Sequence, residues 1–525
     1  MDNSTVSESS FSNLQQPLEI VLQQLQQPIF TASLALIIIL VVATKVLTGD
    51  ATPQPASHNG AKSPRMVSYW IPYIGHIPQA ILGFDGFLAS ISKLYPESIF
   101  SLRLMGSVHN IIHSPSLAGQ LLGQPTAASD PWIHWTFMLN VFGFCETREM
   151  YDAVFFSGDP PYKHITSEPG LGEMTNSTIE HVKRDIADFV TFNSHDVDRT
   201  EWERQGGAET IRTPSGETVV EAELFDLTKT FMGITSGRSI WGTDFIENFP
   251  EVWSHFWAFD RGFMTLAAGL PFWFPWPAAW RAHAARRKVI ACLREYDEAM
   301  EKRMNGEDAG AQWQNLDNVS RLMKWRSQQY HDHGMAMAGR ATADLSFLWA
   351  SNANVSPAVG WMLAEMYRDP VLLEEVREEI APFVVVRQPE SEEFHGAVWV
   401  SPQVERFDLE GLMGRCPLLK SCYVEALRVY THSWSARWLH EDVMLKERGG
   451  GGGRKEKGNG EGREETYLLK KGTYAHVNQD LHHFDAKYFE SPNEFRATRH
   501  ITEKVDGEGK TVKTADLGTV KPYSK

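Results

Sequence analysis

A carboxylate and a guanidinium lie three residues apart in a segment that is predicted to be helical from Pro417 to about Tyr430. The buried stripe of this helix, spaced by 4, 3 and 4 residues, consists of Leu418, Cys422, Glu425 and Val429. Glu425 therefore faces the apolar side, where an unpaired carboxylate costs several kcal/mol. Because Arg428 reaches the same face, the pattern predicts a buried ion pair that needs further hydrogen bonds, although an ordinary surface pair has the same spacing.

The cysteines do not form a pattern for metal or disulfide chemistry. Cys145, Cys292, Cys416 and Cys422 show no CxxC spacing, so neither a zinc site nor a disulfide framework is indicated. The Gly-rich run at 449–465 does not predict a phosphate cradle, because no strand leads into it and no helix follows it. The net charge of −16 argues against nonspecific binding of nucleic acid, which needs a basic surface.

The elements that must position these groups are predicted to be mostly helical. Helical patterns occupy 180–190, 221–240, 281–304 and 336–380, and strand-like alternation occupies 98–104 and 108–113. The sequence contains no βαβ rhythm and no internal repeat. We therefore expect a mainly α fold with a small β region. The segments 130–145 and 225–275, which are poor in motifs, are the expected source of pocket residues.

The composition divides the chain into four parts. They are a short polar tail (1–28), a transmembrane anchor helix (29–47), a polar linker (48–63) and one large domain (64–525) that contains a flexible insert at 449–465.

The anchor is predicted from the run between Ile29 and Thr44, which carries no charge. With its flanks it approaches the roughly 20 residues that cross a bilayer, although a buried core helix could also have this composition. The first basic residues, Lys45, Lys62 and Arg65, follow the run. The excess of positive charge on that side predicts a cytosolic domain and a lumenal tail, which carries a glycosylation sequon at Asn3.

Three ordered motifs resemble the cytochrome P450 family. Glu425-Ala-Leu-Arg428 is similar to the family's ExxR helix, Phe489–Phe495 resembles its PxxF stretch, and Ala497-Thr-Arg499-His500 resembles the PERF-like stretch that follows. The resemblance implies that Arg499 completes a structural triad with Glu425 and Arg428, which locks the loop that presents the haem. It covers about residues 61–525 and implies the cytochrome P450 fold with a haem cofactor.

The central helix departs from the usual family pattern. Thr342–Tyr367 resembles the long helix that crosses the haem, and its run Ala350-Ser-Asn-Ala-Asn354 stands where the family usually has an acid followed by threonine. With Asn354 in the threonine position, the chain resembles the branch of the family that contains prostacyclin synthase and the sterol 7α-hydroxylases, and it looks like a fungal-type member. An amide can donate and accept hydrogen bonds but cannot shuttle a proton as a hydroxyl or acid can. A helix amide bonded to backbone is the alternative for Asn354.

The resemblance implies further cofactor contacts. Ala350 would lie beside the haem, and Arg437 matches a position that often binds a haem propionate, with a surface arginine as the alternative. Val520–Lys525 looks like the start of the family's haem loop, so the cysteine that holds the iron is expected about five residues beyond Lys525.

These implications favour a haem-thiolate monooxygenase in the endoplasmic reticulum membrane. Electrons would come from an NADPH-cytochrome reductase, and the substrate would be a lipophilic sterol, terpenoid or other secondary metabolite. Two alternatives remain open. One is a haem-thiolate isomerase or dehydratase, which rests on Asn354, and the other is a catalytically dead fragment without the iron-ligand cysteine.

Overall fold

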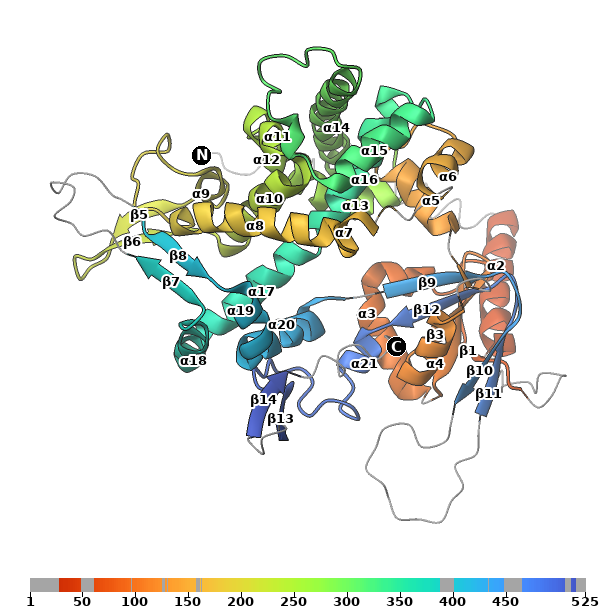
Figure 1. Ribbon diagram of the computed structural model, residues 1–525. Helices are drawn as coiled ribbons and strands as arrows, with labels where there is room; N and C mark the ends of the chain where they lie inside the picture. The colour runs from red at the N-terminus through yellow and green to blue at the C-terminus, as the bar shows by residue number, and fades with distance from the viewer. Residues whose placement is uncertain are drawn as a thin grey trace, which may run out of the picture. The chain divides into compact units, whose positions relative to one another are not determined.

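The structure is a computed structural model (Figure 1). It describes residues 28–48, 61–95, 97–124, 128–129, 131–156, 161, 163–387, 401–432, 434–447, 465–505 and 511–515. The chain groups into two compact units. The first unit comprises Met1–Asp130, His432–Asn493 and Lys521–Lys525, and the second comprises Pro131–Thr431 and Glu494–Val520. The predicted tail with Asn3, nearly all of the predicted linker and insert, and the haem-loop stretch at 520–525 lie outside the described residues.

The first unit is built on a six-stranded sheet with the order β1-β2-β3-β12-β9-β4. Its strands are β1 (Arg65–Met66), β2 (Ile99–Leu104), β3 (Ser107–Ile112), β4 (Ala128–Ser129), β9 (Trp434–Leu439) and β12 (Tyr474–Asn478). The β1–β2 and β3–β12 pairs are parallel, and the other pairs are antiparallel. A separate antiparallel pair joins β10 (Val443–Glu447) to β11 (Glu465–Leu469).

Both faces of this sheet bury apolar side chains, because successive residues of a strand point to opposite faces. Ile99 packs with helix α4 (Pro115–Leu122) on one face, whereas Phe100 packs with helix α3 (Ile77–Leu94) on the other. The short helix α21 (Asp480–His483) follows β12. The strands predicted at 98–104 and 108–113 are therefore confirmed as β2 and β3.

The segment predicted as an anchor forms helix α2 (Pro28–Thr48), which is 21 residues long. Its last turn is bound to the segment that precedes α3. The Lys45 Nζ donates to the Ser68 Oγ at 2.6 Å and lies 5.2 Å from the centre of the Trp70 ring. The C-terminal end of α2 is thus held to the segment at 68–70 within the first unit.

The prediction of a membrane-crossing anchor at 29–47 is not borne out. Within the described parts of the chain, no helix combines the length and the apolar character needed to cross a membrane. About 20 apolar residues are required.

The second unit is mostly helical. Its longer helices are α5 (Pro131–Asn140), α6 (Arg148–Phe156), α8 (Gly170–Asp185), α10 (Leu224–Trp241), α12 (Val252–Arg261), α14 (Pro277–Met304), α15 (Arg321–Asp332), α16 (Met337–Asn352), α17 (Val355–Arg368), α18 (Pro370–Ile380) and α20 (Pro417–Tyr430). The shorter helices are α7 (Lys163–Thr166), α9 (Glu201–Gln205), α11 (Thr243–Asn248), α13 (Phe263–Ala267) and α19 (Leu409–Arg415). Three antiparallel pairs complete it, namely β5 (Glu209–Arg212) with β6 (Thr218–Glu221), β7 (Val384–Arg387) with β8 (Gln403–Phe407), and β13 (Ile501–Val505) with β14 (Thr511–Ala515). The expected mainly α fold with a small β region is confirmed.

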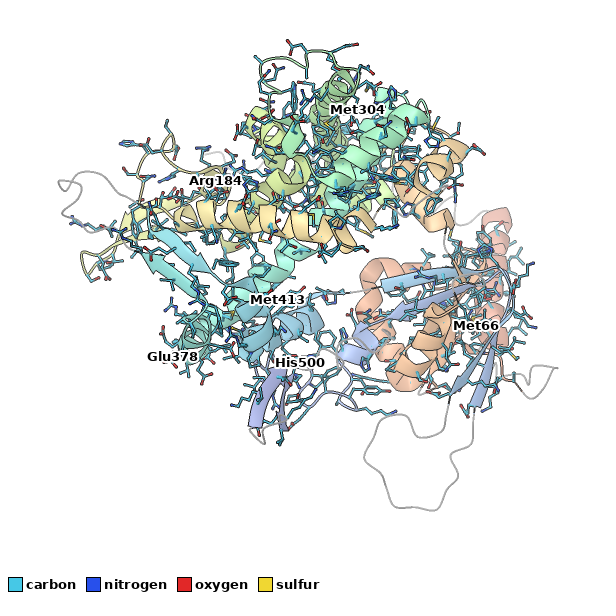
Figure 2. All side chains as sticks on the ribbon, in the orientation of Figure 1. Met66, Arg184, Met304, Glu378, Met413 and His500 are labelled. Carbon is cyan, nitrogen blue, oxygen red and sulfur yellow. The ribbon has the colours of Figure 1, made fainter. Side chains whose placement is uncertain are left out.

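The helix α14 shows why these sequences fold as they do. Pro277 stands in its first turn, where a missing N–H costs nothing. Its buried face repeats at helical spacing through Ala282, Ala285, Val289 and Leu293. Figure 2 shows side chains filling the space among α14, α15 and α16, where the largest apolar cluster of the second unit lies.

Two of the predicted helices differ from the structure. The helix expected at 180–190 begins earlier, as Gly170–Asp185, and ends in a 3-10 turn at Ile186–Asp188. The helix expected at 336–380 is divided into α16, α17 and α18. Pro357 cannot continue a helix from the preceding turn, and Pro370 opens α18 after Asp369 caps its backbone N–H groups.

Candidate functional site

The helix α20 places Glu425 and Arg428 on its buried face. Glu379 of α18 accepts hydrogen bonds at 2.9 Å from the backbone N–H groups of Leu418 and Leu419, in the first turn of α20. A carboxylate at this end satisfies donors that have no partner within the helix and interacts favourably with the helix dipole. Both Glu425 and Arg428 are fully buried, with 0% exposure.

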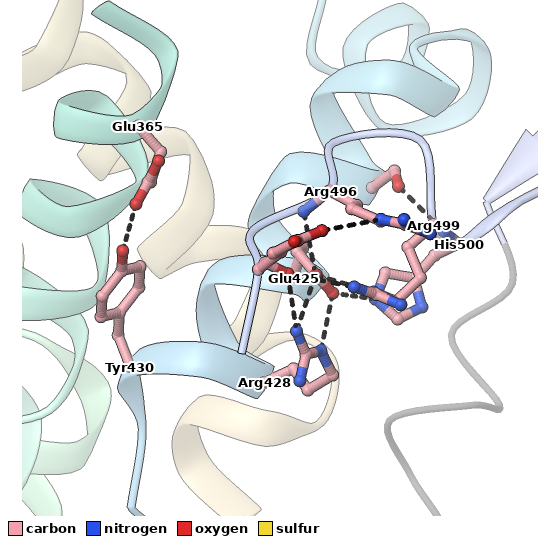
Figure 3. Close-up of polar contacts among 9 residues, drawn as sticks. Glu365, Glu425, Arg428, Tyr430, Arg496, Arg499 and His500 are labelled. Atoms are coloured by element: carbon pink, nitrogen blue, oxygen red, sulfur yellow. Dashed lines mark hydrogen bonds and ion pairs between the residues drawn. The ribbon is translucent and has the colours of Figure 1, made fainter. Parts of the chain in front are cut away.

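The Glu425 carboxylate collects hydrogen bonds from two segments of the chain (Figure 3). Arg428 donates from Nε to Oε2 at 2.9 Å and from Nη2 to Oε1 at 2.8 Å. Arg499 donates from Nε to Oε1 at 2.8 Å, and the backbone N–H of Arg496 donates to Oε1 at 3.1 Å. The His500 Nε2 lies 2.9 Å from Oε2. The structure thus brings Glu425, Arg428 and Arg499 together inside the second unit.

These contacts keep the carboxylate ionised. Burial by itself raises the pKa of Glu425, but the hydrogen bonds from Arg428, His500 and Arg499 hold it well below its usual range. A buried ion pair is tolerated when further hydrogen bonds satisfy its remaining atoms, and this carboxylate meets that condition.

The same groups pin the segment that precedes β13 to α20. The Nη2 atoms of Arg428 and Arg499 both donate to the Glu494 carbonyl oxygen, at 3.2 and 3.0 Å. The backbone N–H of His500 donates to the Ser421 Oγ at 3.2 Å. The arrangement therefore braces the chain at 494–500, and its atoms are occupied with one another rather than with a substrate.

His500 is a partner of Glu425 to which sequence reasoning gave no role. It is 1% exposed and lies beside α20, where Figure 2 labels it. The sequence feature that could have indicated this role is the position of His500 directly after Arg499. A backbone that brings Arg499 to Glu425 also brings the neighbouring residue close to it.

The structure separates the residues predicted for the central helix. Ala350 lies in α16, whereas Asn354 is exposed and stands directly before α17, where it makes no side-chain capping bond. The buried amide is that of Asn352, whose Nδ2 donates to the Leu348 carbonyl oxygen at 3.0 Å. The backbone-bonded amide considered for Asn354 therefore describes Asn352.

A cavity of about 600 Å³ lies beside Ala350 in the second unit. Its wall is formed by His134, Phe137, Phe142, Tyr151, Phe155, Phe156, Pro161, Phe263, Leu322, Arg326, Ser346, Phe347, Trp349 and Ala350. Both segments from which pocket residues were expected contribute to it, whereas its contacts with α6 and α15 were not predicted. Its size and aromatic wall suit a small lipophilic ligand.

Arg437, the predicted propionate ligand, belongs to the first unit. It lies on β9 opposite Ala475 of β12, and its Nη1 donates to the Ala436 carbonyl oxygen at 2.9 Å. The side chain is half-buried. A guanidinium of this kind is chemically suited to a carboxylate partner.

None of the four cysteines lies in the wall of the cavity beside Ala350. Burial raises the pKa of Cys145 and Cys416, that of Cys292 to about 11, and that of Cys422 to about 12. In the absence of a metal these groups are therefore thiols near neutral pH. Across the described residues, no group of three or more His, Cys, Asp or Glu side chains is placed to hold a metal ion.

Comparison with known proteins finds similarity to cytochrome P450 proteins. A family model described as Cytochrome P450 matches residues 258–448. The chain is 25% identical over 391 residues to cytochrome P450 monooxygenase efuG of Hormonema carpetanum, which covers 71% of this chain and 62% of that protein.

Two mammalian proteins are similar at comparable levels. Cytochrome P450 7B1 of Mus musculus is 22% identical over 443 residues, which cover 84% of this chain and 75% of that protein. The 25-hydroxycholesterol 7-alpha-hydroxylase of Rattus norvegicus is 24% identical over 294 residues, which cover 55% of this chain and 60% of that protein. The matched part is thus less than two thirds of the fungal and the rat protein.

Proposed function

We infer that this chain, which belongs to the cytochrome P450 family, is part of a haem-dependent monooxygenase that oxidises a lipophilic substrate. The similar proteins include a 25-hydroxycholesterol 7-alpha-hydroxylase. This agrees with the sterol 7α-hydroxylase branch that the sequence of the central helix predicted. The proposal rests on the buried Glu425 carboxylate and its ion pairs with Arg428 and Arg499. These three residues belong to the sequence motifs that resemble the family, and they meet in the structure.

The haem, when bound, supplies the activation of oxygen. The residues proposed to face it are Ala350 and Asn354, and Arg437 is the proposed partner of a propionate. None of the four cysteines lines the cavity beside Ala350, so none of them is proposed as the iron ligand. Glu425, Arg428 and Arg499 are assigned a positioning role, in which they hold the segment at 494–500 to α20.

The cavity beside Ala350 supports a lipophilic substrate. Phe137, Phe263 and Trp349 are among the aromatic side chains of its wall, and its volume of about 600 Å³ lies in the range of small-molecule pockets. A sterol, a terpenoid or another secondary metabolite is the proposed substrate class. A relative whose name states that it hydroxylates 25-hydroxycholesterol is consistent with this class.

We place the protein at the endoplasmic reticulum membrane, with an NADPH-cytochrome reductase as its electron donor. The support is the group of exposed apolar side chains on α2, which includes Leu36, Ile37, Ile39 and Leu47. Exposed apolar groups of this kind are stabilised by contact with lipid.

The test is turnover by the full-length protein, co-expressed with a reductase and given a panel of sterols and terpenoids. Products heavier by one oxygen atom, formed only with NADPH and the reductase, are the expected result. Conversion of a peroxide substrate without any reductant would instead favour the isomerase or dehydratase that Asn354 leaves open. If no panel compound is converted and added haem gives no Soret band, the proposed function is wrong.

A further inference from the structure

A tryptophan of helix α16 forms part of the wall of the cavity beside Ala350. Trp349 directly precedes Ala350 in the chain, and both residues line the cavity. The ring of Trp349 is stacked on that of Phe263, with 4.4 Å between the ring centres and 19° between the planes. Its centre also lies 5.9 Å from that of Phe142. Phe263 and Phe142 belong to the wall as well, so Trp349 is packed within an aromatic group that borders the cavity.

The indole of Trp349 is also held at its polar edge. Its Nε1 donates to Asp260 Oδ1 of α12 at 2.8 Å. Asp260 does not belong to the wall of the cavity, so the hydrogen-bonded edge of the ring faces α12 rather than the ligand. A side chain with few rotamers that is stacked on one face and hydrogen-bonded at one edge keeps a single orientation.

The contact stabilises both partners. Asp260 is half-buried, and burial raises the pKa of its carboxyl group, whereas the hydrogen bond from Trp349 and the charges of Lys229 and Arg261 lower it. A polar group that loses water is costly without a hydrogen-bond partner, and the indole N–H supplies one. The pair therefore links α12 to α16 and orients one part of the cavity wall.

We propose that Trp349 limits the size of the lipophilic substrate and that Asp260 is the positioning residue that keeps the ring in the wall. The cavity has a volume of about 600 Å³. A ring with one fixed orientation excludes any ligand that needs its space, because a close-packed interior does not yield without strain.

The inference rests on the proposed function, because it takes this cavity as the substrate site. It goes further by naming the residue that selects among lipophilic substrates, the property by which it selects, and the residue that holds it in place.

The test follows the affinity of the full-length protein along a series of straight-chain primary alcohols, from hexanol to hexadecanol. Each alcohol displaces the neutral dye Nile red, and the fluorescence gives its apparent Kd. Each added methylene group that finds room in the cavity should tighten binding by about fourfold. In the wild type this gain should stop at one member of the series, where the chain has filled the cavity.

The key variant is Trp349→Ala, which removes the ring from the wall. In this variant the first alcohol beyond the wild-type limit should again bind about fourfold more tightly than the preceding one. The matched control is Trp280→Ala, since Trp280 is 49% exposed and lies outside the wall, and it should keep the wild-type limit. Because all proteins meet the same alcohols, a shift of the limit does not come from the solubility of the ligands.

Two substitutions at Asp260 test its positioning role while the ring is kept. Asp260→Leu removes the acceptor of the indole N–H, so the ring is free to turn, and the limit should move in the same direction as in Trp349→Ala. Asp260→Asn keeps an oxygen that accepts the hydrogen bond and should keep the wild-type limit. A role of Asp260 in fold stability alone would leave the limit unchanged in both variants.

The outcomes separate this inference from the proposed function. A wild-type affinity that rises without a limit, or a limit that is the same in Trp349→Ala, overturns the role of Trp349 and leaves the lipophile site intact. A wild-type limit in Asp260→Leu overturns the role of Asp260. If the wild type binds neither the dye nor any alcohol, the cavity is not a lipophile site, and the inference falls together with the proposed substrate class. The wild-type and Asp260 series remain decisive even if Trp349→Ala does not fold.

Discussion

At the residue scale, the decisive feature is a single carboxylate that receives donors from two distant segments. Glu425 and Arg428 are neighbours on one helix, whereas Arg499 and His500 reach Glu425 from over seventy residues along the chain, with the His500 Nε2 2.9 Å from the Glu425 Oε2. The sequence motif predicted the arginines. It did not predict His500 or the shared Glu494 carbonyl, because neither contact follows from helical spacing.

Replacing the carboxylate should be costly. In Glu425→Gln the shape is kept, but the buried guanidinium groups of Arg428 and Arg499 lose their counterion. We expect a loss of about 3–5 kcal/mol in the free energy of unfolding, measured by urea denaturation. The matched control is Glu374→Gln, which breaks an exposed i,i+3 pair with Arg377 and should change stability by less than about 1 kcal/mol. Equal effects of the two substitutions would contradict the buried brace.

At the element scale, the sheet of the first unit contains a histidine pair that should make its stability depend on pH. The Trp434 Nε1 donates to the His476 Nδ1 at 2.8 Å, and the His476 Nε2 lies 2.8 Å from the His109 Nδ1. Burial lowers the pKa of His476 to about 3 and that of His109 to about 4. The folded state therefore favours the neutral rings.

The sign of the effect follows from proton uptake. The unfolded chain binds these protons near pH 6.5, whereas the folded sheet resists them until about pH 4 to 3. Stability is therefore complete above about pH 6.5 and is lost as the pH falls toward the folded pKa values. Denaturant unfolding at pH 7.5 and pH 5.5 measures the loss. His476→Gln should reduce it, and His195→Gln, at an exposed position, should not.

The hairpin between β2 and β3 depends on a glycine. Gly106 has a φ of +80°, and an added Cβ would lie 2.6 Å from the Tyr73 ring. Gly106→Ala should therefore lower the free energy of unfolding by about 2–3 kcal/mol, which combines backbone strain with a clash.

The matched control for this hairpin is Gly472→Ala. Gly472 has a similar φ of +75°, but an added Cβ would meet nothing within 4 Å. It should cost only the backbone term of about 1 kcal/mol. Thermal unfolding of the two variants measures the difference, and a larger effect at Gly472 would show that the contact with Tyr73 is not a constraint.

At the scale of the whole molecule, the two compact units should respond differently to a ligand. Each residue of the cavity wall belongs to the second unit. Binding stabilises the state that holds the ligand, so a saturating lipophile should slow amide hydrogen exchange in α15 and α16. Exchange in β2, β3 and β12 should stay the same. Hydrogen-exchange mass spectrometry measures both, and protection confined to the sheet would place the ligand elsewhere.

The sequence by itself determined the features that depend on local spacing. Helical periodicity gave α10 and α14 within a few residues, and the i,i+3 spacing of Glu425 and Arg428 predicted their pairing. The order of motifs along the chain carried the resemblance to the cytochrome P450 family. These features follow from the geometry of a single helix or from the order of residues along the chain. They can therefore be predicted without knowing how the elements pack.

The tertiary structure decided what depends on contacts between elements. It selected Asn352 rather than Asn354 as the buried amide, paired Arg326 of α15 with Asp344 of α16, and enclosed the aromatic cavity. It also gave His500 its place beside Glu425. Each of these requires two segments to meet at a fixed distance and angle, and the free energy of that meeting comes from packing that no single segment encodes.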